Sequence, residues 1–463
     1  MIPFTLAQIA EVTGGLVVPA ECAQVTVAGP VVTDSRQAAP GSLYVARIGE
    51  FADGHEFASG AIQFGAVAAL TTRPLDGVPC VVVDDTERAF GVLGRAVVEA
   101  LPHCTLIGIT GSSGKTSTKD LLGQVLASAA ETIAPEGSFN SEIGVPLTLC
   151  RAQQSTRFLV VEMGARGIGH IAYLAGIAPP DIGVVLNVGV AHVGEFGSVE
   201  AIALAKRELV EALPVDGVAV LNADDPVVAA MARHTNARVV FVGEAADADV
   251  RAIDVELTPH GAARFTVRAG GFQHRLTLTV IGRHHIGNAL AVVAVALECG
   301  LDLAAACLAL ESAAPLSRWR MQVTQRPDGV TVINDAYNAN PDSMRAALDA
   351  LHHLGAGRRS WAVLGAMLEL GADSDALHAA VGAYALSREV DELLVVGEAA
   401  APIAQGARET EGTTNVRLVP DAEAAAVLLG QELRRGDVVV FKSSRDAGLR
   451  WLGDRVAQEE VQP

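Results

Sequence analysis

Residues 108–120 form a glycine-rich stretch, GITGSSGKTSTKD, in which Lys115 and Thr116 follow the last glycine. A short apolar run precedes it and a helical pattern follows, which is the context of a phosphate-binding loop. In such a loop, backbone N–H groups attract phosphate oxygens, the lysine reaches the β- and γ-phosphates, and the hydroxyl binds Mg²⁺. Ile109 stands where such loops usually begin with a glycine, so the loop starts at Thr110. The stretch predicts a bound nucleotide, with an incidental glycine turn as the alternative, and does not indicate the reaction.

Three polar residues follow other predicted strands. Glu162 ends the run VVEM, and Asn187 and His192 follow the run DIGVVL. Ligands of open α/β sheets bind beyond the carboxyl ends of the strands, so these side chains are expected near the loop. A carboxylate there can bind Mg²⁺ directly or through water. For His192 the alternative is a loop histidine with a backbone hydrogen bond.

Lys206 interrupts an apolar stripe, because Ile202, Lys206, Leu209 and Leu213 recur at helical spacing. One interpretation is a lysine whose amine reaches solvent at the edge of the stripe. The other is a partly buried amine with a lowered pKa. Such a neutral amine reacts with CO₂ to form a carbamate, which is an anionic metal ligand. The spacing does not distinguish the two.

The composition is that of a cytoplasmic globular protein. The 463 residues are 50% hydrophobic and 19% charged, which suits about three domains with proper cores. The net charge is −19 without a Lys/Arg cluster, so nucleic acid is not an expected partner. The six cysteines form no CxxC pair and are expected to be reduced thiols. The N-terminus does not resemble a signal peptide.

From about residue 104, apolar runs bounded by turn signals alternate with helical patterns, which indicates a doubly wound α/β fold with parallel strands. Residues 1–85 mix short strands and loops, and 87–101 is a predicted connecting helix. A second α/β unit follows about residue 315, after a predicted hinge at 314–323.

The secondary structure of two segments of the first unit is predicted separately. Residues 250–281 are expected to add antiparallel strands. Residues 288–310 are apolar enough to raise the question of a membrane span, but Glu298, Gly300 and Asp302 interrupt them. They are therefore predicted to form two buried helices, and no membrane insertion is expected.

The chain resembles the Mur ligases, ATP-dependent enzymes that add amino acids to a nucleotide-linked cell-wall precursor. The resemblance covers nearly the whole length. It rests on the loop TGSSGKTSTKD and on motifs that follow it in the family's order, namely FNSEIGVPLTL, VVEMGA, NVGVAHVGEFGS, AKRELV, LNADD, GRHHIGNAL, NDAYNANPDSM and SSRDAGL. DSRQAAPGSLYVARIGEFADGHEF and NDAYNANPDSM with LGAMLELG resemble the subgroup that adds D-alanyl-D-alanine.

The resemblance implies an α/β protein of three domains: a small N-terminal UDP-precursor-binding domain at 1–100, a central P-loop ATP-binding domain with a parallel sheet at 101–313, and a C-terminal Rossmann-like domain at 314–463. The implied reaction joins D-Ala-D-Ala to UDP-N-acetylmuramoyl-tripeptide through an acyl phosphate, with ATP and Mg²⁺. The implied protein is a monomer.

Roles carried over from the family fall into four groups. The implied catalytic residues are Lys115, His192 and Lys206, the last as a carbamate. The implied metal ligands are Thr116, Glu162, His192 and Lys206. The implied nucleotide contacts are Thr110, Gly111, Ser112, Ser113, Gly114, Lys115, Thr116, Ser117, Asn140, His284, Asn288, Arg320, Asp335 and Asn338. The implied uridine-nucleotide region contains Ser35, Arg36, Asp53 and His55.

Two departures from the family pattern affect single contacts. His285 stands where a second Asn is common, and GSFNSE lacks the doubled Asn often seen near Asn140. Three other functions stay open: another amide ligase of this fold, such as an amino-acid-adding enzyme or a folylpolyglutamate synthetase; a P-loop NTPase that couples hydrolysis to motion; and a degenerate nucleotide-binding scaffold. The N-terminal 85 residues argue against a folylpolyglutamate synthetase, which lacks such a domain.

Overall fold

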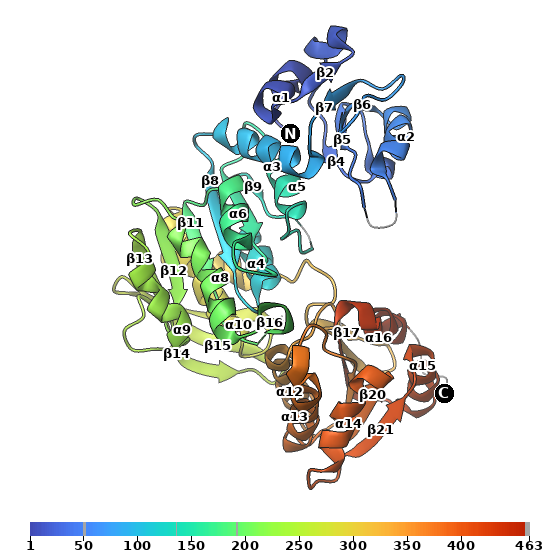
Figure 1. Ribbon diagram of the computed structural model, residues 1–463. Coiled ribbons are helices and arrows are strands. Elements are labelled where there is room, and N and C mark those ends of the chain that lie inside the picture. Colours follow the sequence, from blue (N-terminus) through green and yellow to red (C-terminus); the bar gives the residue numbers. More distant parts are fainter. Residues whose placement is uncertain (50–51, 136, 191–192, 459–463) are drawn as a thin grey trace.

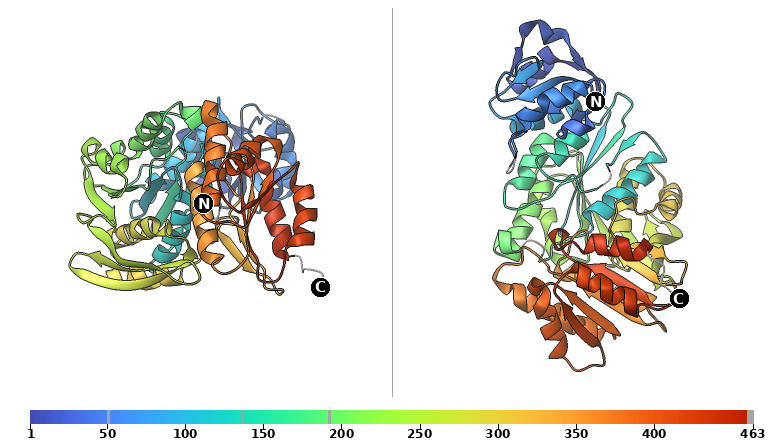
Figure 2. Two further views of the ribbon diagram at one scale, coloured as in Figure 1. Left: turned by 90° about the horizontal axis from the view of Figure 1, so that it is seen from below. Right: turned by 90° about the vertical axis from the view of Figure 1, so that its right-hand side faces the viewer.

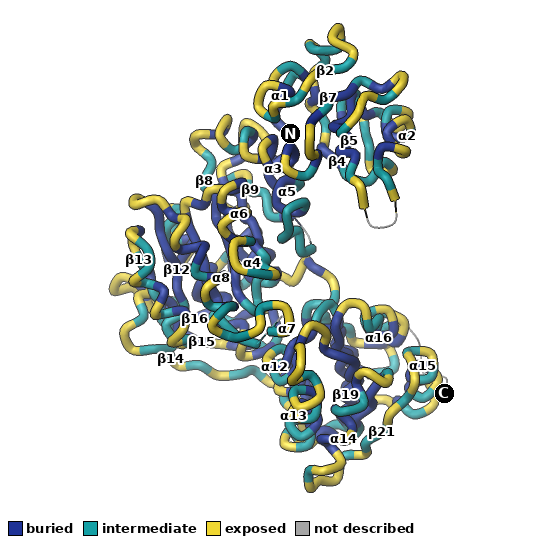
Figure 3. The backbone as a smooth tube through the Cα atoms, viewed as in Figure 1, coloured by how far each residue is buried: buried dark blue, intermediate teal, exposed yellow. Residues whose placement is uncertain are grey.

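The computed structural model describes residues 1–49, 52–135, 137–190 and 193–458. These residues form three α/β units, each built on one main sheet, that follow one another along the molecule (Figures 1 and 2). The inner strands of the central and C-terminal sheets are buried, whereas most connecting loops at the periphery are exposed (Figure 3). Since parallel strands need cover on both faces, the buried runs of Val, Ile and Leu found from the sequence fit this arrangement.

The N-terminal unit is a small mixed sheet. Its strand order is β2-β7-β6-β5-β4, and only the β2–β7 pair is antiparallel. The strands are β2 (Leu16–Val18), β4 (Val31–Val32), β5 (Ser42–Val45), β6 (Ala66–Thr71) and β7 (Cys80–Val82), with a separate ladder of β1 (Phe4–Thr5) and β3 (Thr26–Val27). The helices are α1 (Leu6–Thr13), α2 (Ala58–Gln63) and α3 (Thr86–Glu99), the last being the predicted connecting helix.

The central sheet has nine strands in the order β16-β15-β14-β13-β12-β11-β8-β10-β9, parallel except for the β14–β15–β16 edge. The strands are β8 (Thr105–Thr110), β9 (Thr132–Ile133), β10 (Phe158–Glu162), β11 (Ile182–Val185), β12 (Val218–Asn222), β13 (Arg238–Gly243), β14 (Val250–Leu257), β15 (Ala262–Ala269) and β16 (Phe272–Ile281). β8 lies between β10 and β11, so its carboxyl end is flanked by Glu162 and the segment after Val185.

Helices cover both faces of the central sheet. The helices are α4 (Lys115–Ala127), α5 (Gly144–Leu149), α6 (His170–Ile177), α7 (Val193–Phe196), α8 (Val199–Glu211), α9 (Pro226–Ala229), α10 (His285–Glu298) and α11 (Leu303–Ser312). One cluster packs Leu122, Val292 and Leu310 against one face. The other contains Ile171 and Leu209 and continues through α3 into the N-terminal unit. Each such fully buried side chain stabilises the fold by about 1.5–3 kcal/mol.

The C-terminal sheet has the order β17-β18-β22-β19-β20-β21, with only β17 antiparallel. Its strands are β17 (Gln322–Gln325), β18 (Thr331–Asn334), β19 (Ser360–Leu364), β20 (Glu392–Val396), β21 (Asn415–Val419) and β22 (Val438–Lys442). Its helices are α12 (Pro341–Leu354), α13 (Ser374–Ser387), α14 (Ala401–Arg408), α15 (Ala422–Glu432) and α16 (Leu449–Gln458), which pack two further apolar clusters.

The predicted α/β class is confirmed, and so are the antiparallel strands at 250–281 and the two helices within 288–310. Sequence reasoning missed β17 and β21. Both are edge strands whose side chains are partly exposed, so neither produces the continuous apolar run of a buried strand. In the part of the chain that the structure describes, no helix is long and apolar enough to cross a membrane.

Candidate functional site

The glycine-rich loop connects β8 to α4 at the carboxyl edge of the central sheet. Gly114 has φ = +82°, and a Cβ there would lie 2.6 Å from Asn288 Oδ1, so both conformation and space require glycine. The amide of Asn187, two residues after the end of β11, fixes the loop. Its Oδ1 accepts from Ser113 N at 2.9 Å, and its Nδ2 donates to Ser113 O at 3.2 Å. The first turn of α4 is thereby held with its N–H groups toward the site.

Glu162 is the centre of a buried hydrogen-bond network beside this loop. Its Oε2 accepts from Thr116 Oγ1 at 2.9 Å, and its Oε1 accepts from Ser138 Oγ at 2.8 Å and from Asn140 Nδ2 at 2.7 Å. The residue is only 3% exposed. The parallel register of β10 and β8 explains the proximity of Glu162 and Thr116, which are 46 positions apart in the sequence.

Two lysines face the site from different helices. Lys115 Nζ donates to Gly111 O at 2.6 Å. Burial lowers the pKa of Lys115, and the Glu162 carboxylate opposes that shift. Lys206, on α8, is 5% exposed, and burial and then the charge of Lys115 lower its pKa well below the usual value. Among the described residues, no carboxylate forms an ion pair with Lys206. The structure therefore decides against a lysine that reaches solvent at the edge of the stripe.

The opposite wall comes from the linker and the C-terminal unit. Arg320 Nη2 donates to Thr116 Oγ1 at 3.3 Å, and its guanidinium lies 4.2 Å from the ring centroid of Tyr337. Asp335 Oδ2 pairs with Lys442 Nζ at 2.7 Å, and the same amine donates to Asn338 O at 2.7 Å. The phosphate-loop helix and the 335–338 loop thus meet through one arginine.

These walls enclose a cleft of about 620 Å³ between the central and C-terminal units. Every residue predicted to contact nucleotide lines it except Thr110, which is buried behind the loop at the end of β8. Glu162 and Lys206 line it as well. Residues more than 330 positions apart, from Gly111 to Lys442, therefore share one cavity.

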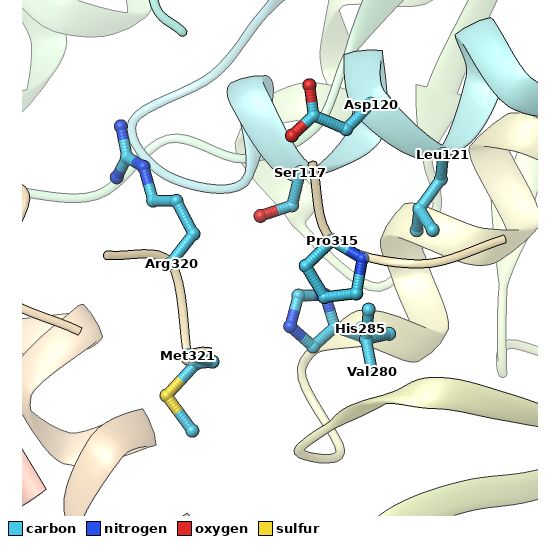
Figure 4. A pocket seen from close by; sticks show the side chains of 8 residues that line it. All are labelled: Ser117, Asp120, Leu121, Val280, His285, Pro315, Arg320 and Met321. Carbon is cyan, nitrogen blue, oxygen red and sulfur yellow. The ribbon is translucent and has the colours of Figure 1, made fainter. Parts of the chain in front are cut away.

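The GRHHIGNAL segment begins α10 beside the linker. Asn288 is 5% exposed, and its Nδ2 lies 3.3 Å from Nδ1 of His285, which is also buried. A small cavity of about 10 Å³ lies here, with Arg320 and Met321 on one side and Ser117 and Asp120 of α4 across from them (Figure 4). His285, which stands where a second Asn is common in the family, is thus a buried and packed side chain.

The four residues assigned to the uridine-nucleotide region lie in the N-terminal unit and do not line the cleft. Arg36 is exposed and pairs with Asp34. The ring of His55 is enclosed: Nδ1 lies 2.6 Å from Asp53 Oδ1, and Nε2 accepts from Thr72 N at 2.9 Å. Arg73 and His55 hold the pKa of Asp53 well below its usual range. Ser35 begins a short 3₁₀ helix.

His192, the remaining predicted site residue, lies outside the described residues.

Several cleft residues were not found from the sequence. They include Ser138, Glu142, Arg166, His170, Tyr337, Lys442 and Arg445. Lys442 could have been found, because it ends the apolar run VVVF and so lies at the carboxyl edge of a strand, as Glu162 does. The others lie in loops or at the first residue of a helix, as His170 and Arg445 do, where no periodic pattern marks them.

The donor set fits Mg²⁺ bound together with phosphate. Thr116 and Glu162 supply a hydroxyl and a carboxylate next to the loop. No cluster of three or more His, Cys, Asp or Glu residues occurs in the ranges that the structure describes. Mg²⁺ typically takes one or two carboxylates and completes its shell with water and substrate phosphates, so a closed protein cage is not required.

Comparison with known proteins agrees with this geometry. A family model for the Mur ligase middle domain matches residues 109–296, and one for the Mur ligase glutamate ligase domain matches residues 319–445. UDP-N-acetylmuramoyl-tripeptide–D-alanyl-D-alanine ligase from Mycobacterium tuberculosis is 47% identical across 100% of this chain and 99% of its own. The enzyme of that name from Escherichia coli is 37% identical over 86% of this chain and 87% of its own.

Solved structures give the same result. A crystal structure of MurF from Acinetobacter baumannii superposes with a TM-score of 0.88 at 30% identity, covering 99% of both chains. MurF from Thermotoga maritima in complex with ADP gives 0.80 at 28% identity, covering 94% of this chain and 98% of that one. On these full-length matches, the chain belongs to the Mur ligase family, among relatives named UDP-N-acetylmuramoyl-tripeptide–D-alanyl-D-alanine ligases.

Proposed function

We propose that this protein is the ATP-dependent ligase that joins D-Ala-D-Ala to UDP-N-acetylmuramoyl-tripeptide in the cytoplasm, releasing ADP and phosphate. The observation that carries the proposal is the single cleft that combines a phosphate loop, a hydrogen-bonded carboxylate and a buried lysine, facing an arginine from the linker. The names of the full-length relatives supply the substrates.

The loop and its helix bind the ATP phosphates. Backbone N–H groups of residues 111–116 and the Lys115 ammonium receive the β- and γ-phosphates. Gly111 O is the acceptor for that ammonium in the structure, and the amine exchanges this bond for phosphate oxygens when ATP binds. His284 and Asn288 face the base, and Arg320, Asp335 and Asn338 complete the nucleotide site from the other wall.

Thr116 and Glu162 hold Mg²⁺ when the nucleotide binds. The ion supplies positive charge that reduces repulsion between the triphosphate and the precursor's carboxylate. Ser138 and Asn140 keep the Glu162 carboxylate in place through the hydrogen bonds described above. His192 is proposed as a further metal-supporting residue on the basis of its motif alone.

Lys206 is proposed to act as a carbamate. Its lowered pKa favours the neutral amine, which attacks CO₂, forms an N–C bond and loses one proton to solvent. The product replaces a buried neutral amine by an anion beside Lys115 and the proposed metal site. The positive charges of Lys115 and the metal ion would stabilise that anion.

The chain's part in the chemistry is positioning. The precursor's carboxylate attacks the γ-phosphorus, ADP leaves, and an acyl phosphate forms, whose phosphate is a far better leaving group than oxide. The dipeptide amine attacks the acyl carbon and loses a proton to solvent, the tetrahedral intermediate loses phosphate, and an amide remains. Water must be excluded, since it would hydrolyse the acyl phosphate. Gly194 N donates to Glu369 O at 2.9 Å, so the two units already touch at the cleft rim.

The test is phosphate release from ATP by the purified full-length protein with UDP-N-acetylmuramoyl-tripeptide and a panel of amines: D-Ala-D-Ala, D-Ala-D-lactate and single amino acids. We expect release to require both precursor and D-Ala-D-Ala. Preference for a single amino acid would indicate another amide ligase of this fold. Release without precursor would indicate an NTPase, and no release under any condition would indicate a scaffold.

A further inference from the structure

The segment after β11, residues 186–189, lies against the phosphate loop. Ser112 N donates to Asn187 O at 3.1 Å, and Gly189 N donates to Ser112 Oγ at 2.9 Å. The Asn187 amide also bonds to both the N–H and the carbonyl of Ser113. The glycines of the loop leave its backbone wide conformational freedom, so these bonds fix its shape. The arrangement of the loop's N–H groups therefore depends on where residues 186–189 lie.

The motif LNADD, at the end of β12, holds the 186–189 segment from the side away from the phosphate loop. Asn222 Nδ2 donates to Leu186 O at 2.9 Å, and Asp225 Oδ2 accepts from Val188 N at 2.8 Å. In the sheet, β11 lies between β12 and β8, so the segment after β11 has the motif on one side and the loop on the other. It is bonded to both.

The motif is itself anchored to the end of the next strand, β13. Ala223 N donates to Val242 O at 2.8 Å. The Asp224 carboxylate accepts from Glu244 N at 2.8 Å and from Ala245 N at 2.9 Å. A row of hydrogen bonds therefore runs along the carboxyl edge of the sheet, from β13 through β12 and β11 to the phosphate loop after β8.

The Asp225 carboxylate has two tasks, one for each oxygen. Its Oδ2 accepts from Val188 N, whereas its Oδ1 accepts from Val227 N at 2.9 Å and from Val228 N at 3.2 Å and so caps α9. Asp225 does not line the cleft, so an effect on a ligand bound there passes through other residues. A serine at this position keeps one oxygen for the cap but has no second oxygen for Val188 N.

We propose that Asp225 is a positioning residue for the phosphate loop: through Val188 N it holds the 186–189 segment, to which the loop is bonded. Asn222 supports the same segment at Leu186 O. The inference rests on the proposed nucleotide site. It assigns a task to a motif none of whose five residues, 221–225, lines the cleft. The loop's N–H groups receive phosphate only when they converge on it, so a shift of the segment weakens nucleotide binding.

Two substitutions separate the two tasks of the carboxylate. Asp225→Ser and Asp225→Ala both lose the bond to Val188 N, but only the alanine variant loses the cap of α9. Isothermal titration with Mg²⁺ and ATP, without precursor, measures the affinity. We expect both variants to bind ATP about tenfold more weakly, while thermal unfolding falls chiefly for alanine. If Asp225→Ser binds ATP as wild type does, the carboxylate only caps α9 and the inference is overturned.

A double-mutant cycle tests the route through the 186–189 segment. Asn187→Ala, Asp225→Ser and the double variant are compared with wild type in the same titration. If Asp225 acts through the segment that carries Asn187, the loss of ATP affinity in the double variant is clearly smaller than the product of the two single losses. If the two factors multiply, Asp225 acts by a separate route and the inference is wrong.

Asp302→Ala is the matched control for the loss of a helix cap alone. Asp302 Oδ1 accepts from Ala305 N at 2.8 Å and caps α11, and Asp302 does not line the cleft. This variant should unfold at a lower temperature and bind ATP with wild-type affinity. An equal loss of ATP affinity in Asp302→Ala would show that lowered stability alone explains the result, against the inference.

The titration requires no turnover, so it separates this inference from the proposed function. Wild type that binds ATP but shows no ligase turnover would refute the proposed reaction and leave the role of Asp225 standing. Wild type with full ligase turnover, together with an Asp225→Ser variant of unchanged ATP affinity, would refute the role of Asp225 and leave the proposed function standing.

Discussion

The cleft and the N-terminal unit differ in how they use their polar residues. In the cleft, side chains from β10, α4, α8, the linker and β22 point into one shared volume. In the N-terminal unit, Arg36, Asp53 and His55 are each bonded to a neighbour within about 20 positions, at Asp34, Arg73 and Thr72. The first pattern is assembled by the tertiary fold, and the second stabilises local turns.

This difference suggests a division of roles. Changes in the cleft should act on the chemical step, because its side chains surround the site of phosphoryl transfer. Changes in the N-terminal unit should act on precursor affinity or on stability, because its polar groups hold the loops of a small sheet. The five predictions below test that division, beginning with the largest expected effect.

Removal of the phosphate-loop ammonium should have the largest effect. Lys115→Ala should lower kcat about 10³-fold or more, because the ammonium stabilises the charge that develops on the transferred phosphoryl group. Single-turnover ADP formation measures it. Lys115→Arg is the matched control and should recover part of the loss. A Lys115→Ala variant within tenfold of wild type would show that the cleft's chemistry does not depend on the loop.

Removal of the buried lysine should have a comparable or smaller effect that can be reversed. Lys206→Ala should lower kcat about 10²–10³-fold, since a proposed anionic ligand is lost. Formate or acetate, supplied in the millimolar range, should restore part of the activity by occupying the vacated space. The same salts should not help Lys115→Ala. Activity close to wild type without any added acid would refute the metal-ligand role.

Separation of the two units at the cleft rim should have an intermediate effect. A Cβ at Gly194 would lie 2.4 Å from Gly371 N, so Gly194→Val should push α7 away from the C-terminal unit and lower kcat about tenfold. Gly176→Ala, in open space on α6, is the control. Small-angle scattering with and without an ATP analogue checks the cause. Equal profiles for variant and wild type, with equal kcat, would show that this contact does not govern closure.

In the N-terminal unit, His55→Ala should chiefly lower stability. The ring is buried, and the variant removes both the acceptor of Thr72 N and the ring's bond to Asp53. We expect the free energy of unfolding to fall by about 1–3 kcal/mol, measured by urea denaturation. If unfolding is unaltered while the KM for the precursor rises strongly, the ring instead contacts substrate directly.

The smallest expected effect belongs to Arg36, whose side chain is exposed. Arg36→Ala should raise the KM for the UDP-linked precursor several-fold and leave the unfolding transition unchanged, because an exposed ion pair contributes little to stability. Isothermal titration with the precursor measures the affinity. Asp34→Ala is the matched control for the ion pair itself. If the Arg36→Ala variant binds the precursor with wild-type affinity, Arg36 does not contribute to binding of the uridine nucleotide.

Most of the fold and about half of the site could be predicted from residue patterns. Buried parallel strands give uninterrupted apolar runs, so β8 and β10 to β13 were predictable, whereas the half-exposed edges β17 and β21 were not. Glu162 and Asn187 were predictable because they end such runs. Tyr337, Arg166 and Lys442 were missed, since loop residues follow no period and a lysine that ends a strand was not sought.

The sequence alone determined the phosphate loop, the strand ends beside it and the family, because each depends on residues close together in the chain or on motifs in a fixed order. Only the tertiary structure decided that the Lys206 amine is buried beside Lys115. It alone decided that Lys442 pairs with Asp335 and that Arg320 reaches Thr116. The physical reason is that burial, pKa and reach depend on packing between segments 90 to more than 300 positions apart, and no local pattern records it.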